Sequence, residues 1–301
     1  MKVKITKTKI QTFFTYDFWK VVAISVLVCF VLVICINCSE EKPTLGQEFT
    51  CLYSEDIILG EDSATVLYYA GYAGEPYAFS YDITNIKSRQ IQAGDQGQES
   101  SLSTFVDLYE DDIFICTDSL ASKYLESSYA QSFESYVNGA FEYLYSNNFY
   151  SRDGVINETA IVDNFVNNYK KDNRFKTEEN INLGKELEIA RIKTLYSNAT
   201  ILKNVIENHA YIFSDTLTKY EWAGNTFTGK FAIELGKLKG GEYNVLNGFQ
   251  RKVKNSETGE VSHTADGVYL FIGFNAEQNG HLHYESMAYI IALLKMYTNI
   301  I

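Results

Sequence analysis

The chain has 301 residues, of which 26 are Lys or Arg and 38 are Asp or Glu, so its formal net charge at pH 7 is −12. This acidity argues against nucleic acid as a partner, because no stripe of basic residues is present to neutralise phosphates. Hydrophobic residues make up 46% of the chain and aromatic residues 15%, which is enough for a packed core and argues against a disordered chain.

The first element expected along the chain is a membrane-spanning helix. Residues 21–36 form an uncharged, almost entirely apolar run directly behind a lysine-rich start. The first twenty residues contain five lysines and one aspartate, and lysine-rich flanks stay on the cytoplasmic side of a membrane. The predicted order is therefore a cytoplasmic tail, a single transmembrane anchor in the cell membrane, a linker and an extracytoplasmic domain, at residues 1–18, 19–38, 39–47 and 48–301.

Three other interpretations of the apolar run stay open. A cleaved signal peptide would have a shorter start and small residues at the cut site, whereas residues 34–38 contain no Ala-x-Ala sequence. A lipoprotein cut before Cys38 would need a small residue ahead of it, where this chain has Asn37. A soluble core helix would carry a polar stripe, which the run lacks. Length and flanks favour the uncleaved anchor, with the lipid bilayer around residues 19–38.

Beyond the linker, stretches rich in β-branched and aromatic residues predict strands. These strands are expected at residues 49–53, 64–70 and 77–83. A short helix through Leu102, Phe105 and Leu108 then leads to a strand at 112–117, which is apolar enough to be buried on both faces.

In the middle of the chain, apolar residues recur every three or four positions, which predicts helices. One follows Asp118 and carries an apolar stripe to Leu144, a second starts at Asn157, and a third runs over 185–213. The last ninety residues return to strands, followed by a helix with Met287, Ile291, Leu294 and Tyr297 on one side. The strands are expected at residues 230–235, 249–253, 261–264 and 268–274. This order predicts an α+β or irregular α/β fold, in two interleaved lobes rather than two separable domains.

Three segments resemble a known group of proteins. The start FFTYDFWKVVAISVLVCFVLVI is similar to that of single-pass membrane proteins of Gram-positive bacteria, some of which carry an extracytoplasmic domain related in outline to solute-binding proteins. In those domains an acidic residue after a strand opens a helix, and DIFICTDSLASKYLES at 112–127 looks similar, as do GVYLFIGF and ESMAYIIALLKMY near the end. Residues 128–215 are more continuously helical than such a lobe needs, and no ligand residue can be carried across.

Candidate metal ligands and thiols are few. His281, His283 and Glu285 would share one face of a strand, but they border a predicted helix, where that geometry fails. Cys38 and Cys51 leave open a disulfide in an oxidising space. The remaining acidic candidates lack the spacing of a calcium loop, and they are Asp107, Glu110, Asp111 and Asp112. No metal or cofactor is therefore expected.

Tyrosine is the remaining candidate for recognition. The chain has 23 tyrosines, and a side chain with an apolar ring and a polar tip suits sugars, peptides or proteins, although a tyrosine-rich core accounts for the same number. The speculative ligand-binding residues crowd the first strand region, and they are Tyr68, Tyr69, Tyr72, Tyr77 and Tyr81.

The sequence contains no nucleophile motif such as G-x-S-x-G and no phosphate-cradling loop, so no enzyme is expected. The expected function is that of a membrane-anchored extracytoplasmic binding or accessory protein, with membrane proteins as further partners. One alternative is a structural subunit of a secretion or conjugation machine, which self-association through the helix at 185–213 would favour. The second alternative is a carboxylate-dependent cell-wall or peptide hydrolase, which would show convergent carboxylates in a cleft.

Overall fold

The computed structural model describes residues 18–39, 48–72, 83, 85–91, 102–108, 111–169, 174–274 and 284–301. The chain divides into two compact units, residues 1–44 and 45–301. The described part of the first unit is helix α2 (Phe18–Ser39). Among the described residues, no helix is both long and apolar enough to cross a membrane. The anchor at residues 19–38 stays a prediction from the sequence.

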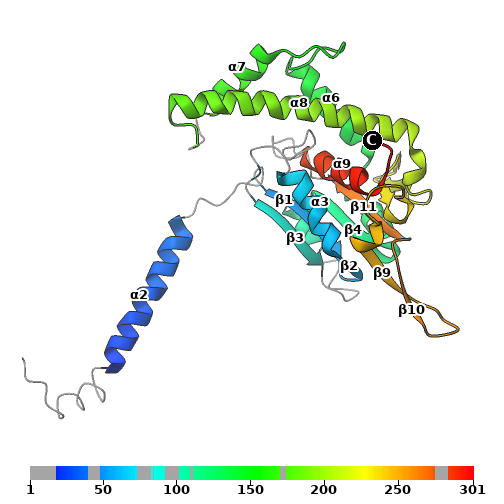
Figure 1. The fold of residues 1–301 in the computed structure, drawn as a ribbon, viewed down its shortest axis with the longest axis horizontal. Coiled ribbons are helices and arrows are strands. Elements are labelled where there is room, and N and C mark those ends of the chain that lie inside the picture. Colours follow the sequence, from blue (N-terminus) through cyan, green and yellow to red (C-terminus); the bar gives the residue numbers. More distant parts are fainter. Residues whose placement is uncertain are drawn as a thin grey trace, which may run out of the picture. The chain divides into compact units, whose positions relative to one another are not determined.

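The second unit is built on a mixed six-stranded sheet, and the α+β class predicted from the sequence is confirmed (Figure 1). Its strands are β3 (Asn85–Ile91), β1 (Glu48–Ser54), β4 (Ile113–Thr117), β11 (Val268–Gly273), β5 (Ala130–Gln131) and β8 (Ala232–Glu234). Strands β3, β1 and β4 run parallel, whereas β11 is antiparallel to β4 on one edge and to β5 and β8 on the other. The prediction of a central strand near 268–274 is therefore confirmed.

Two smaller β elements complete the unit. Strands β2 (Ile57–Leu59), β9 (Phe249–Lys254) and β10 (Val261–Thr264) form an antiparallel sheet in the order β10-β9-β2. Strands β6 (Lys219–Trp222) and β7 (Asn225–Thr228) form a separate hairpin. The two predicted strands around the polar turn at 256–259 are thus confirmed as β9 and β10.

The helices cover both faces of the main sheet. They are α3 (Glu61–Tyr72), α5 (Asp118–Glu126), α6 (Phe133–Ser146), α7 (Glu158–Asn168), α8 (Glu178–Asn208) and α9 (Glu285–Tyr297), with a helical turn at 102–107 and short 3-10 turns η4 (Ala210–Ile212), η5 (Leu235–Lys237) and η6 (Val245–Asn247). Helix α9 packs against α3 and α8, and α8 in turn packs against α6 and α7. In Figure 1, α9 lies between the sheet and α8.

Alternate residues of each central strand point to opposite faces, so the sheet separates two cores. Ile113 and Ile115 of β4 pack in the core that contains α9, whereas Phe114 and Cys116 pack in the core that contains α5. All five residues of β4 are buried, as predicted for a strand covered on both faces.

Residues 64–70 form part of helix α3, so the strand predicted there is wrong. Two acidic residues, Glu61 and Asp62, occupy the first turn, where negative charge favours a helix. Val66 and Ala70 are fully buried four positions apart, which places them on one helix face. Packing against α9 therefore outweighs the β propensity of the valine and tyrosines in this segment. Of the strand predicted at 77–83, residues 77–82 lie outside the described residues.

The single helix predicted from Asp118 to Leu144 is also wrong, because the chain forms two helices separated by β5. Ser128 has a left-handed backbone with a φ of +56°. Ser132 then caps α6, its hydroxyl accepting a hydrogen bond from the Ser135 amide. Gln131 pairs with Ile272 of β11, so one strand of the sheet replaces the turn of helix that the stripe predicted.

The other helical predictions are confirmed with shifted ends. Asn157 caps α7, and its side chain accepts a hydrogen bond from the Ala160 amide. Helix α8 begins at Glu178 and ends at Asn208, where 185–213 was predicted. Its buried face packs within the unit, against α6, α7 and α9. The face proposed for self-association is therefore used inside the fold.

Cys51 is a buried free thiol, so the disulfide considered between Cys38 and Cys51 is not formed. Burial, opposed by a hydrogen bond with Tyr289, raises the pKa of the Cys51 thiol to about 12. Cys116 is likewise free and buried, as predicted for a small apolar residue.

Candidate ligand site at the carboxyl edge of the main sheet

The strand order creates a switch point between β1 and β4. From β1 the chain crosses to β3 on one side, and it then returns to β4 on the other side of β1. Connections that leave two neighbouring parallel strands in opposite directions open a crevice at their carboxyl ends, where ligands of α/β sheets bind. Ser54 ends β1 and Thr117 ends β4, so both lie at this edge.

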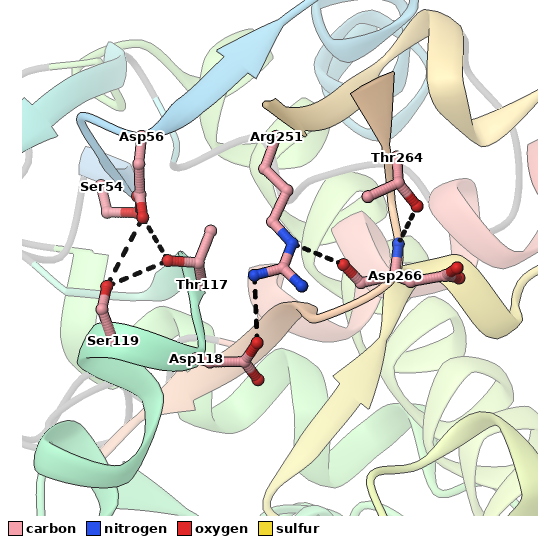
Figure 2. A network of polar contacts seen from close by, with 8 residues as sticks. All are labelled: Ser54, Asp56, Thr117, Asp118, Ser119, Arg251, Thr264 and Asp266. Atoms are coloured by element: carbon pink, nitrogen blue, oxygen red, sulfur yellow. Dashed lines mark hydrogen bonds and ion pairs between the residues drawn. The ribbon is translucent and has the colours of Figure 1, made fainter. Parts of the chain in front are cut away.

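Hydroxyl groups gather around Asp56 at this edge (Figure 2). The Ser54 and Thr117 hydroxyls each donate a hydrogen bond to the Asp56 carboxylate. The Ser119 hydroxyl lies 3.1 Å from the Thr117 hydroxyl and 3.5 Å from Asp56 Oδ2. Ser54 and Thr117 are buried whereas Asp56 is exposed, so the fixed donors lie beneath an accessible carboxylate.

Arg251 reaches the same edge from β9. Its Nη1 donates to Asp118 Oδ2 at 3.0 Å, and its Nε donates to the Asp266 carbonyl oxygen at 2.7 Å (Figure 2). The Arg251 side chain is 27% exposed and that of Asp118 is 57% exposed. Gly267 has a φ of +68°, and a Cβ there would lie 2.5 Å from Arg251 Nη2. The backbone thus leaves room for the guanidinium and holds it in one place.

The acidic groups of the edge perturb their buried neighbours. Burial raises the pKa of Tyr269 well above its usual range, and a hydrogen bond to Asp118 raises it further. Burial also raises the pKa of the Cys116 thiol, with added contributions from the charges of Asp56 and Asp118. The charges of Asp56 and Asp118 thus act on buried groups near the end of β4.

A cavity of about 550 Å³ adjoins the edge. Its walls come from the loop at residues 236–246 and from residues 264–266. Thr264 and Asp266 belong both to the cavity wall and to the polar network of Figure 2, where the Asp266 amide donates to the Thr264 hydroxyl at 3.0 Å. The volume lies within the range of small-molecule pockets, about 300–1,000 Å³.

Only some of the tyrosines predicted as ligand residues lie in the described part of the chain. Tyr68 lies on α3 with 57% of its surface exposed. Tyr69 forms a hydrogen bond with Tyr243 of the cavity wall, and this bond raises the pKa of Tyr243. Tyr72 ends α3, whereas residues 77 and 81 lie outside the described residues. Of the five, Tyr69 is therefore the one that the described structure connects to the cavity, and ligand binding by the set stays a prediction.

The other chemical candidates lie elsewhere. Asp111 and Asp112 are buried just before β4, at the opposite end of that strand from the candidate site. Glu285 is buried in the first turn of α9, and residues 281 and 283 are outside the described part of the chain. Within the described ranges, no group of three or more His, Cys, Asp or Glu side chains could hold a metal ion.

Two sequence signals could have located this site. The polar segments Ser54–Asp56 and Thr117–Ser119 each begin at the end of a strand with buried residues, which marks the carboxyl edge of a parallel sheet. Arg251 carries no such signal, because it comes from a strand of a different sheet. In comparisons with family models, curated proteins and solved structures, no significant match was found.

Proposed function

We propose that this chain is a membrane-anchored extracytoplasmic binding protein, without catalytic activity, that holds a small polar ligand at the carboxyl edge of its main sheet. The observation that carries the proposal is the convergence of buried hydroxyls and a positioned arginine at the β1/β4 switch point, next to a cavity of suitable volume. The anchor rests on the uncharged run at 21–36 and its lysine-rich flank, and the absence of catalysis rests on the missing nucleophile motifs.

Ligand binding is tested with the full chain purified in detergent. Amino acids, short peptides, sugars and inorganic anions are screened by thermal shift, and each hit is measured by calorimetry. A ligand at 100 times its Kd should stabilise the folded state by about 2.7 kcal/mol. We expect Arg251→Gln to weaken binding by at least about tenfold, because a charged donor is lost from the site.

The matched control is Arg152→Gln, which removes an exposed arginine that lies over the Tyr145 ring before α7. This variant should bind as the unaltered chain does. A screen without any hit, or an Arg251→Gln variant with unchanged affinity for every hit, would contradict binding at this edge.

The anchor is tested separately in cells that produce the full chain. The protein should stay in the membrane fraction after alkaline carbonate extraction, and protease added to intact protoplasts should digest residues 45–301. Release by carbonate would exclude a spanning helix. Fatty-acid labelling that disappears in Cys38→Ser would instead show the lipoprotein that the sequence left open.

A further inference from the structure

The polar groups at this edge indicate which charge a bound ligand carries there, given the proposed function. Side-chain donors from three strands of the edge are directed at carboxylates of the chain itself. The buried hydroxyls of Ser54 and Thr117 donate to Asp56, and the guanidinium of Arg251 donates to Asp118. Both carboxylates are exposed, so the acceptors face solvent while the donors are fixed beneath them.

Arg251 is held independently of Asp118. Its Nε donates to the Asp266 carbonyl oxygen, and its stem belongs to β9, which pairs with β2. Removing the Asp118 carboxylate would therefore leave a positioned guanidinium. Arginine binds carboxylate and phosphate oxygens through its planar set of N–H donors, so an oxyanion is the chemical class that fits the freed position.

Asp118 has the freedom to leave this position. It is the first residue of α5, its side chain is 57% exposed, and its partners across the edge are the side chains of Arg251 and Tyr269. An ion pair this exposed contributes little to stability, so another anion can replace it at low cost. The Tyr269 hydroxyl would then supply a second donor to the incoming group.

We propose that Asp118 occupies the place of an anionic ligand group on Arg251, and that it sets the affinity of the edge for oxyanions by competing with them. The local charges have the same consequence. Asp118 pairs with Arg251 and the Asp56 carboxylate lies at the same edge of the sheet, so an incoming anion meets two carboxylates beside one guanidinium. Neutralising Asp118 removes both the competitor and one repelling charge.

The test measures binding of inorganic phosphate and sulfate to the full chain by calorimetry at low and high salt. Asp118→Asn should bind these anions about two- to fivefold more tightly than the unaltered chain, and the gain should shrink at high salt. Arg251→Gln should bind them more weakly than the unaltered chain. Asp118→Ser is the second variant, because it removes the carboxylate and keeps a polar side chain at the first position of α5, behind the N-cap residue Thr117.

The matched control is Glu158→Gln, which removes one carboxylate from an exposed ion pair with Lys193 at 2.7 Å. Glu158→Gln changes the net charge by the same amount as Asp118→Asn, but at the start of α7. The anion affinity of this variant should equal that of the unaltered protein. Equal affinities for Asp118→Asn and Glu158→Gln would overturn the inference.

The failure of this inference differs from the failure of the proposed function. If the screen finds a ligand that needs Arg251 while both Asp118 variants bind anions no better, the binding function stands and the competition by Asp118 is excluded. Tighter binding of methylammonium than of either anion by the unaltered chain would also overturn the inference, because the edge would then prefer cations. If no variant and no compound gives binding, both proposals fail.

Discussion

At the scale of single residues, the most unusual environment is that of Asp111. Its side chain is 1% exposed, its Oδ2 accepts a hydrogen bond from the Tyr124 hydroxyl at 3.2 Å, and its Oδ1 has no partner among the described residues. Burial, together with the adjacent charge of Asp112, raises the pKa of Asp111 well above its usual range. The folded chain therefore favours the neutral acid more than the unfolded chain does.

The raised pKa of Asp111 predicts a defined pH dependence of stability. The folded state keeps this proton above pH ~4, where the unfolded chain has lost it. The folded state thus binds more protons, and its free energy of unfolding falls as the pH rises towards the folded pKa, by up to about 1.4 kcal/mol per pH unit. Asp111→Asn should remove this contribution and give a flatter curve.

The measurement is urea unfolding of the two proteins at a series of pH values from about 4 upward, since the contributions of all other groups cancel in the difference. Asp163→Asn, an exposed position on α7, is the control and should run parallel to the unaltered chain. Parallel curves for Asp111→Asn would show that the pKa of Asp111 is the same in the folded and the unfolded chain.

At the scale of elements, the break between α5 and α6 is the feature that shapes the middle of the chain. Ser127 closes α5 with a φ of −78°, and Ser128 follows with a φ of +56°, a conformation that costs an L-residue about 1–2 kcal/mol. The chain can then leave the helix direction and place Ala130 beside Gly273 of β11. A serine thus occupies a position that suits glycine.

Two neighbouring substitutions test this backbone geometry. Ser128→Gly should relieve the left-handed strain, whereas Ser127→Gly only adds backbone freedom to the unfolded chain, so the first variant should be the more stable by about 1 kcal/mol. Thermal unfolding of both variants measures the difference. A lower melting temperature for Ser128→Gly than for Ser127→Gly would mean that the Ser128 side chain, whose hydroxyl donates to the Ser127 carbonyl oxygen, matters more than the strain.

Local sequence signals were sufficient to predict some of the helices and strands but not others. Strands such as β4 and β11, and helices such as α7, have local signals that agree with their surroundings, and they were predicted correctly. Residues 64–70 combine β propensity with a helical environment, and only the packing of α3 on α9 decides between them. The stripe from Leu125 to Leu144 is nearly periodic, but pairing with a strand about 140 residues later ends the helix. The candidate site could not be predicted in full for the same reason, since Arg251 reaches it from another sheet.

At the scale of the whole second unit, helix α9 is the centre of the fold. Twelve of its residues are buried, although the sequence predicted one apolar side. It contacts both α3 over the sheet and α8 of the helical layer, so it joins the two. Because this helix is buried between them, we expect the sheet and the helical layer to lose their packing together.

The central position of α9 predicts that the sheet and the helical layer of the second unit unfold cooperatively. Leu293→Ala at the centre of α9, where the side chain is fully buried, should lower the free energy of unfolding by about 2–5 kcal/mol. Leu183→Ala on the exposed side of α8, where 52% of the side chain is accessible, should change it by less than about 0.5 kcal/mol. Denaturant unfolding followed by near- and far-UV circular dichroism should give coincident transitions in Leu293→Ala. Separate transitions would show that the sheet and the helical layer unfold independently.

The pairing of β11 with β4 has a consequence for synthesis. Val268 pairs with Thr117, so about nine tenths of the chain must be synthesised before β4 receives its antiparallel neighbour. Until then the nascent chain presents an apolar strand with one bare edge, the arrangement most prone to association with other chains. We therefore expect newly made protein to need a holding chaperone for most of its translation, and truncated chains that end before residue 268 to be degraded or to aggregate.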